Sequence, residues 1–289
     1  MLAQKLGRYS CTKAYPSSQW KELALRTCGR ARWNSSVAAA EGLPQTDTNK
    51  AEVTLRRFWK DVGLDQRGEG YAVTLDKRAL KTPSGNTLLL PKSKRLVASL
   101  IAAEWDHQET LLKHHALPLT SIASRATDTL TETSARQEVE QSLLKYFETD
   151  TVCFFDENSE RLARLQKERW VPLIDWARKT FDVEINVSNS VLSPSQPTAT
   201  KEKLFEAMES LNSWELAALE RATLATKSFI IGMAVVKGHL NVEQAALAAS
   251  AEVDSQIQVW GEVEDTHDVD YQDVRRQLGS AALLLVNEV

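Results

Sequence analysis

The sequence contains little of what defines several large classes of protein. It has three Cys among 289 residues, which excludes a fold held together by disulfides. Eleven Gly and eight Pro are too few for a collagen-like or linker-dominated chain. The longest apolar run, residues 229–236, is far shorter than the roughly 20 residues that cross a bilayer. We therefore expect no membrane insertion, and 43% hydrophobic residues are enough to build a buried core.

The motifs of common enzymes and metal sites are also missing. Gly-Lys does not occur, which excludes a P-loop, and neither a dinucleotide-binding glycine pattern nor a His-Glu-x-x-His or Cys-x-x-Cys motif is present. His107 and His114 lie about 10 Å apart along a helix, too far for one metal ion. We expect no enzyme of a common type and no metal ion. Because Asp and Glu occur throughout the chain, an enzyme that uses dispersed carboxylates stays open as an alternative.

The net charge of −4 combines two different segments. Residues 1–33 carry seven basic residues and one acidic residue, so the remaining residues, 34–289, carry −10. A basic segment with scattered Ser, Thr, Leu and Trp is typical of a mitochondrial transit peptide, and a basic tail without a targeting role is the alternative. Residues 34–50 have the composition of a linker. We therefore expect a mitochondrial protein.

The acidic remainder of the chain limits its partners. A segment of charge −10 does not favour nucleic acid, which requires clustered Lys and Arg. It suits a neutral or basic protein partner better. Removal of the transit peptide would leave Cys153 as the single cysteine. Because Cys153 lies in an apolar run, we expect a buried and unreactive thiol.

Residues 51–117 have the pattern of a small antiparallel sheet with a covering helix. We expect strands at 53–59, 71–75, 78–82 and 87–90, with tight turns at 76–77 and 83–86. A helix should begin at Pro91, and its apolar stripe should pack on the sheet. The stripe consists of Val97, Ile101, Trp105 and Leu112, joined by Leu96 and Leu100. We expect Pro118 to end this unit.

Residues 118–289 carry helical signals throughout. We expect a helix around 170–181, a loop at 193–197, a helix from Ser213 to Lys237, a helix capped by Asn241 that continues to Trp260, and a last helix at 271–285. The predicted fold class is α+β. A small antiparallel β-rich N-terminal domain with a covering helix is followed by an all-helical C-terminal domain.

Three stretches carry a resemblance to a known family. The first is Arg57–Lys60 (RFWK) followed by Tyr71–Pro83 (YAVTLDKRALKTP). The second is Ile101–Trp105 (IAAEW) running to Leu117–Thr120 (LPLT). The third is Glu252–Glu264 (EVDSQIQVWGEVE). Together, and in this order, they resemble the family of mitochondrial ATP synthase F₁ assembly factor 2.

The resemblance implies a function that the composition alone does not provide. It implies a chaperone of the mitochondrial matrix, without catalytic activity or cofactor, that binds the unassembled α subunit of ATP synthase. It would prevent aggregation of this subunit until α pairs with β. We expect a monomer. A structural subunit that stays in a finished mitochondrial complex is a further alternative, besides the matrix enzyme.

The resemblance also indicates candidate partner-binding residues. Glu252 occupies the family's acidic position before Trp-Gly and flanks the apolar face of its helix; an ordinary solvated Glu is the alternative. Asp254 and Gln256 belong to the same set. Trp59 is a candidate anchor, since Trp is frequent at binding hot spots, although packing between the sheet and the helix that carries Trp105 explains it better. Trp260 continues an apolar stripe, so we expect it in the core.

Overall fold

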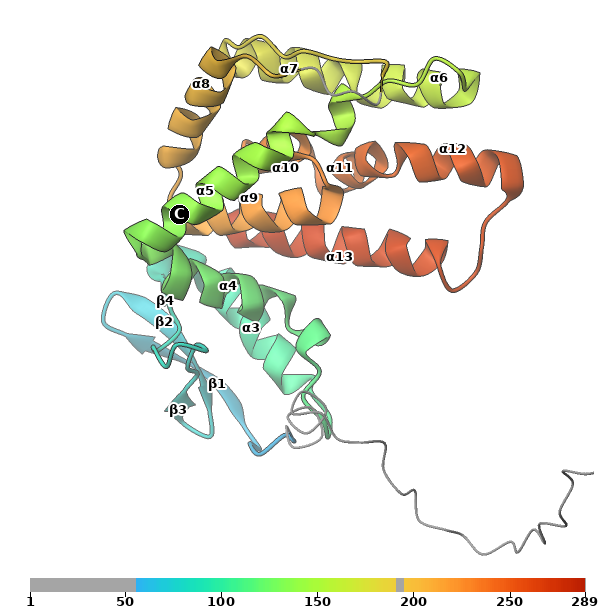
Figure 1. The fold of residues 1–289 in the computed structure, drawn as a ribbon. Helices are drawn as coiled ribbons and strands as arrows, with labels where there is room; N and C mark the ends of the chain where they lie inside the picture. Colours follow the sequence, from blue (N-terminus) through green and yellow to red (C-terminus); the bar gives the residue numbers. More distant parts are fainter. Residues whose placement is uncertain (1–55, 191–194, 289) are drawn as a thin grey trace, which may run out of the picture. The chain divides into compact units, whose positions relative to one another are not determined.

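The structure is a computed structural model that describes residues 56–190 and 195–288. The predicted transit peptide and linker lie outside the described residues. Within them, a small antiparallel sheet is followed by many helices (Figure 1), so the α+β prediction is confirmed. No helix in these two ranges combines the length and the apolar character that a membrane span needs.

The sheet consists of β1 (Val62–Arg67), β2 (Gly70–Leu75), β3 (Arg78–Ala79) and β4 (Leu89–Pro91). β2 lies in the middle and pairs antiparallel with each of the other three strands. The two predicted turns are confirmed. Asp76 and Lys77 have φ of 49° and 69°, the left-handed conformation of a tight hairpin turn, and Gly85 has φ of 84°.

The first predicted strand is wrong. In the described part of 53–59, Arg56 forms only an isolated bridge with Leu111, and residues 57–59 are irregular. The strand that pairs with β2 lies further along, at 62–67, and is half-buried or exposed on every residue. Only Val62 and Leu64 of this strand pack on the core, and this alternation is too short to be recognised in the sequence.

Helix α3 (Arg95–Asp106) covers the sheet, as predicted. Val97, Ile101 and Trp105 are buried against strand residues that include Val73 and Leu90. The predicted stripe is wrong at Leu112, because α3 ends at Asp106, and at Leu96, which is exposed. Pro91 ends β4 rather than opening the helix, and the short helix η1 (Lys92–Lys94) intervenes. Pro118 is the first residue of the next helix.

The remaining described residues are almost entirely helical. In chain order they form η2 (His114–Ala116), α4 (Pro118–Asp128), η3 (Thr129–Thr131), α5 (Thr133–Glu148), η4 (Thr151–Cys153), α6 (Glu160–Arg169), α7 (Val171–Phe181), α8 (Thr198–Glu209), α9 (Ser213–Thr226), α10 (Phe229–Val236), α11 (Val242–Ala249), α12 (Ala251–Trp260) and α13 (His267–Leu285).

The helix expected from Ser213 to Lys237 is two helices. Asn212, and not Ser213, caps α9, through a capping box with Glu215. The chain then turns at Lys227, with φ of 58°, and the Ser228 hydroxyl accepts the Ile231 N–H to start α10. No Gly or Pro lies between Ser213 and Ile231, so the sequence contains no strong helix breaker at this point.

The helix expected after Asn241 is also divided. Asn241 forms the predicted capping box with Gln244, but α11 ends at Ala249 and α12 begins at Ala251. The last helix begins at His267, four residues earlier than the predicted start at Tyr271.

The core runs continuously from Trp59 beside the sheet to Leu284 in α13. Its central pair is α9 and α10, where a Cβ built on Gly232 would lie 2.6 Å from the Thr223 hydroxyl oxygen. Cys153 is buried, as predicted, and burial, together with the nearby Asp150, raises the pKa of its thiol. The division into domains at 117/118 stays a prediction; buried apolar residues continue across it.

Candidate functional site

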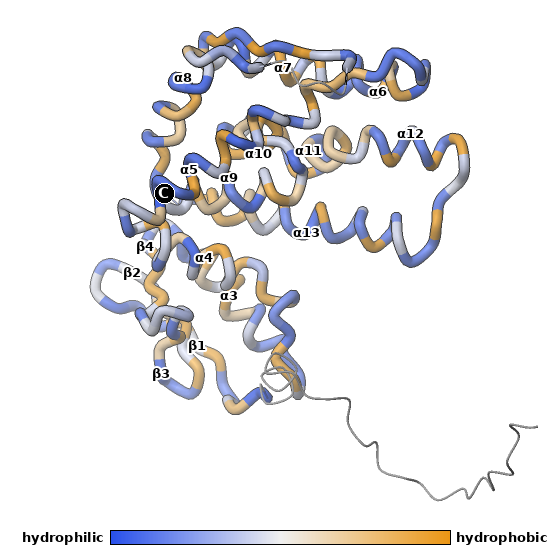
Figure 2. The backbone as a smooth tube through the Cα atoms, viewed as in Figure 1, coloured by the Kyte–Doolittle hydropathy of each residue, from blue (hydrophilic) through white to orange (hydrophobic). Residues whose placement is uncertain are grey.

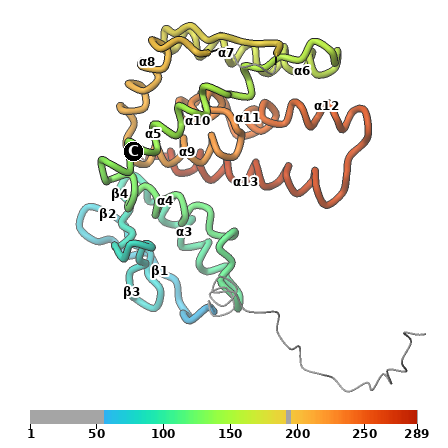
Figure 3. The backbone as a smooth tube through the Cα atoms, in the orientation of Figure 1, coloured from blue at the N-terminus to red at the C-terminus, as the bar shows by residue number. Residues whose placement is uncertain are grey.

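The third stretch of the resemblance lies on two helices joined by a loop, which we call the acidic hairpin (residues 252–273). It comprises most of α12, the loop 261–266 and the start of α13. The loop lies at the end of the two helices that is remote from the sheet (Figures 1 and 3). α12 packs on α6, and α13 packs on α9, α4 and α11. Hydrophilic and hydrophobic residues alternate along both helices (Figure 2).

Six apolar side chains of the acidic hairpin stay outside the core. They are Val253, Val259, Trp260, Val263, Val269 and Tyr271. The largest of them, Trp260, is 78% exposed, so the prediction that it belongs to the core is wrong. Helix α6 does not extend far enough to bury this ring. Arg161, in the first turn of α6, donates to the carbonyl of Gln258, and Trp260 lies beyond that turn. Exposed apolar side chains gathered in this way are typical of a binding surface.

The same segment is strongly acidic. Residues 252–273 contain eight acidic residues and no Lys or Arg. Two of them, Asp254 and Asp273, form ion pairs with Arg169 and Arg276. The other six form no salt bridge with any residue that the structure describes: Glu252, Glu262, Glu264, Asp265, Asp268 and Asp270. Carboxylates without a salt bridge therefore alternate along this segment with the exposed apolar side chains.

The four predicted site residues lie in different surroundings. Glu252 and Gln256 are exposed, four residues apart on α12. Asp254 is half-buried and accepts from Arg169 and from the Ser250 hydroxyl, so it fastens α12 to α6. Trp59 is 3% exposed, and its ring centroid lies 5.0 Å from that of Trp105. The acidic hairpin thus brings Glu252 and Gln256 together, while the ring of Trp59 is packed on the sheet side.

The first two stretches of the resemblance are occupied in contacts within the fold. Arg57 donates to the carbonyls of Trp59, Asp106 and Gln108, which ties the chain before β1 to the end of α3. The Glu104 carboxylate accepts the N–H groups of Leu119 and Thr120 at 2.7 and 2.9 Å. Glu104 therefore caps the start of α4 from the neighbouring helix, and burial raises its pKa.

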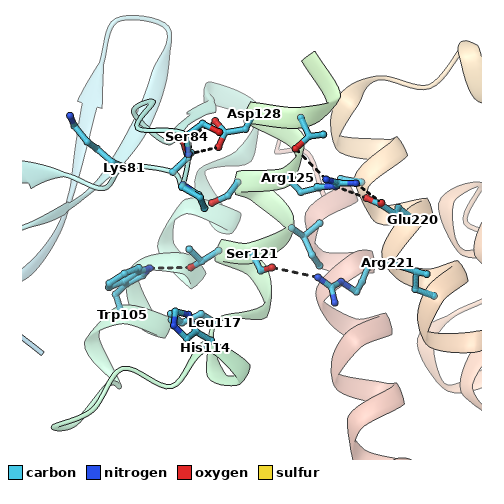
Figure 4. Close-up of a pocket in the computed structure, with 18 of the residues that line it drawn as sticks. Lys81, Ser84, Trp105, His114, Leu117, Ser121, Arg125, Asp128, Glu220 and Arg221 are labelled. Carbon is cyan, nitrogen blue, oxygen red and sulfur yellow. Dashed lines mark hydrogen bonds and ion pairs between the residues drawn. The ribbon is translucent and has the colours of Figure 1, made fainter. Parts of the chain in front are cut away.

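The structure also contains a cavity of about 700 Å³ between the turn 81–84, α4 and α9 (Figure 4). Two carboxylates line it. Although desolvation opposes the effect, hydrogen bonds from Asn86, Thr82 and Ser84 lower the pKa of Asp128. Glu220 pairs with Arg125 at 2.8 Å. A carboxyl whose pKa is lowered in this way does not suit a general acid at neutral pH. No group of three potential metal ligands occurs among the residues described.

The chain is similar to known proteins over most of its length. A family model described as ATP12 chaperone protein matches residues 56–178. "Protein atp12, mitochondrial" of Schizosaccharomyces pombe is 35% identical over 261 residues, covering 86% of each chain. "Protein ATP12, mitochondrial" of Saccharomyces cerevisiae is 32% identical over 279 residues, covering 82% of this chain and 86% of that protein.

A solved structure agrees with these sequence relatives. The crystal structure of Atp12 from Paracoccus denitrificans has a TM-score of 0.70 and 28% sequence identity, and it covers 81% of this chain and 98% of that one. The family is one of chaperones, not of enzymes. On fold and sequence together, the chain belongs to the ATP12 chaperone family.

Proposed function

We propose that this chain is an assembly chaperone of the mitochondrial matrix that holds the free α subunit of the ATP synthase F₁ head until α pairs with β. Family membership supports the chaperone role, and the resemblance described above supports the identity of the client. The yeast relatives are named as mitochondrial proteins. The basic segment 1–33 is consistent with import. We further propose that the chain acts as a monomer.

The observation that carries the proposal is the acidic hairpin. A subunit that belongs in a ring exposes apolar faces before its neighbours arrive, and such faces aggregate. Trp260, Val259 and Val263 offer an apolar surface that can cover one of them. The surrounding carboxylates would steer encounter with a basic or neutral face and disfavour acidic partners. Glu252 and Gln256 would contact the rim of that interface.

Binding of separately produced α and β subunits to the chain tests the proposal. We expect capture of α and not of β, with weaker capture by the Trp260→Ala and Glu252→Ala variants. Phe58→Ala is a matched control for Trp260, because both rings are 78% exposed and only Trp260 belongs to the acidic hairpin. Glu202→Ala, an exposed residue of α8, is the matched control for Glu252.

The outcomes separate the possibilities. Capture of neither subunit would overturn the proposed function. Capture of α that is weakened only by Phe58→Ala would keep the function and move the contact to the region before β1. Stoichiometric presence of the chain in purified, fully assembled ATP synthase would favour the structural-subunit alternative, because a chaperone leaves its client on assembly.

A further inference from the structure

The cavity between the turn 81–84, α4 and α9 contains binding groups that the proposed function does not use. Its volume of about 700 Å³ is within the range of ligand sites. Leu224, on α9, is 39% exposed, and Leu112 is half-buried at the other side. The lining therefore offers accessible apolar surface next to polar groups.

Arg221 provides a positive charge that is not neutralised by a salt bridge. Its side chain reaches from α9 toward Ser121 on α4 (Figure 4), with 3.5 Å between Nη2 and the serine hydroxyl oxygen. It forms no salt bridge with any described residue. The charge of Arg221 acts on the nearby Asp273 of α13. The carboxylate oxygens of Asp273, however, accept from Arg276 and Gln277.

Arg125 lies one turn along α4 from Ser121 and lines the same cavity. Unlike Arg221, it is paired with a carboxylate. Its Nε and Nη2 atoms lie 3.0 and 2.8 Å from the two carboxylate oxygens of Glu220. This two-pronged contact is the arrangement that a guanidinium prefers with a carboxylate. Arg221 has the same donors without the acceptor.

Ser124 adds a second group without a partner. It is 8% exposed and lines the cavity, and its hydroxyl has no hydrogen bond to any residue in the described ranges. The hydroxyl is not fully buried and borders the cavity, so it is available to an acceptor from outside the chain. Ser121 and Ser124 lie one helical turn apart on α4, on the side that faces Arg221 and Leu224.

We infer that this cavity is a second binding site, which takes an extended protein segment that presents a carboxylate between apolar side chains. The carboxylate would accept from Arg221 and Ser121, and the flanking apolar side chains would pack on Leu224 and Leu112. The charge preference is opposite to that of the acidic hairpin. A client held at both places would have to offer a basic or neutral face to one and an acidic segment to the other.

The test uses the full chain and a defined probe. The probe is an acetylated and amidated pentapeptide of Ala, Leu, Glu, Leu and Ala, and its matched control replaces the Glu by Gln. We expect the Glu peptide, at millimolar concentration, to shift the amide resonances of residues 121, 124 and 221 in the labelled chain. The Gln peptide, or the Arg221→Gln variant, should lose most of this effect. Arg164→Gln, an exposed residue of α6, should retain it.

Equal binding of the two peptides, or shifts that avoid the cavity, would overturn the inference. The result is independent of the α subunit, so the proposed function and this inference can fail separately. If the chain captures α, the Arg221→Gln variant should in addition lower that affinity several-fold. An unchanged affinity for α would show that the site does not contact this client.

Discussion

At the scale of single residues, two tryptophans should respond differently to the same substitution. Trp260→Ala should change the free energy of unfolding by less than about 0.5 kcal/mol, because its ring is 78% exposed. Trp105→Ala should cost about 3–5 kcal/mol, because its ring is buried in the core. Urea unfolding measures both. A large destabilisation by Trp260→Ala would mean that this ring packs within the fold.

Glu104 should contribute to stability even though its carboxyl group is partly buried. Glu104→Ala would leave the N–H groups of Leu119 and Thr120 without their acceptor at the start of α4, and we expect a loss of about 2–4 kcal/mol. Glu104→Gln retains one acceptor oxygen and should lose less. Thermal or urea unfolding of the two variants provides the comparison, and equal stability of Glu104→Ala and the parent chain would contradict this role.

The sequence could predict these residues only in part. Helical periodicity correctly groups Val253, Ile257 and Trp260 on one face of α12, but it does not say whether a neighbouring helix covers that face. Helix α6 covers α12 only as far as about Gln258, and this limit is set by tertiary packing. Glu104 likewise lies 15 residues from the backbone that it caps, and no local capping pattern identifies such a partner. The resemblance alone indicated both regions.

At the scale of elements, the contact between α9 and α10 should make one glycine indispensable. A Cβ on Gly232 would lie 2.6 Å from the Thr223 hydroxyl oxygen and 3.1 Å from Leu219 Cδ1. We expect Gly232→Ala to cost about 1–3 kcal/mol through overpacking, although helix propensity alone favours Ala by about 1 kcal/mol.

Gly279 in α13 is the matched control, because a Cβ there would meet no atom within 4 Å. Gly279→Ala should therefore gain up to about 1 kcal/mol. Chemical unfolding of the two variants side by side measures both signs. A stabilising Gly232→Ala would show that α9 and α10 can separate without loss.

The junction of η4 and α10 should make stability depend on pH. Burial raises the pKa of Asp150 to about 6 from an ordinary value of 3.8, against the opposing hydrogen bonds from Ser228, Ile230 and Val152. Between these two values the unfolded chain releases the proton while the folded chain retains it. This residue should therefore lower the free energy of unfolding as the pH rises from about 4 to about 6.

Asp150→Asn removes the titrating group and keeps one acceptor oxygen. The unfolding free energy of the parent chain, relative to that of this variant, should then fall as the pH rises across the same interval. Urea titrations at several pH values measure it. A difference that does not change with pH would contradict a protonated Asp150 in the folded state.

Elements were predictable where the signal is local. The turn at Asp76 and Lys77 and the capping box of Asn241 depend on a few adjacent residues, and both are confirmed. The break at Lys227 and Ser228 contains neither Gly nor Pro and was not recognised. The strand β1 was missed because its residues are polar and its position is fixed by pairing with β2.

At the scale of the whole molecule, the acidic hairpin should make client binding sensitive to salt. Six of its carboxylates form no salt bridge among the described residues, so attraction to a basic face acts through solvent. At 1 M salt such attraction is screened beyond about 3 Å. For the α subunit proposed above as the client, we expect the association rate to fall about tenfold between low and high salt, with little change in the dissociation rate.

Trp260→Ala should show the opposite kinetic pattern, with faster dissociation and an unchanged salt effect, because it removes apolar contact rather than charge. Surface plasmon resonance at several salt concentrations separates the two. An association rate that does not respond to salt would argue against electrostatic steering by the acidic hairpin.

The buried Lys94 links the order in which the chain is made to the order in which it can fold. Its ammonium group donates to the carbonyl of Leu284 at 2.6 Å, across 190 positions of sequence, and burial lowers its pKa. Until residue 284 has been synthesised, or has passed a translocation pore, this group has no acceptor at that position. The contact that joins η1 to the end of α13 therefore forms only once nearly the whole chain is present. A chaperone built in this way reaches its holding conformation only after nearly all of its chain has been delivered, so a partly delivered chain would need protection of its own.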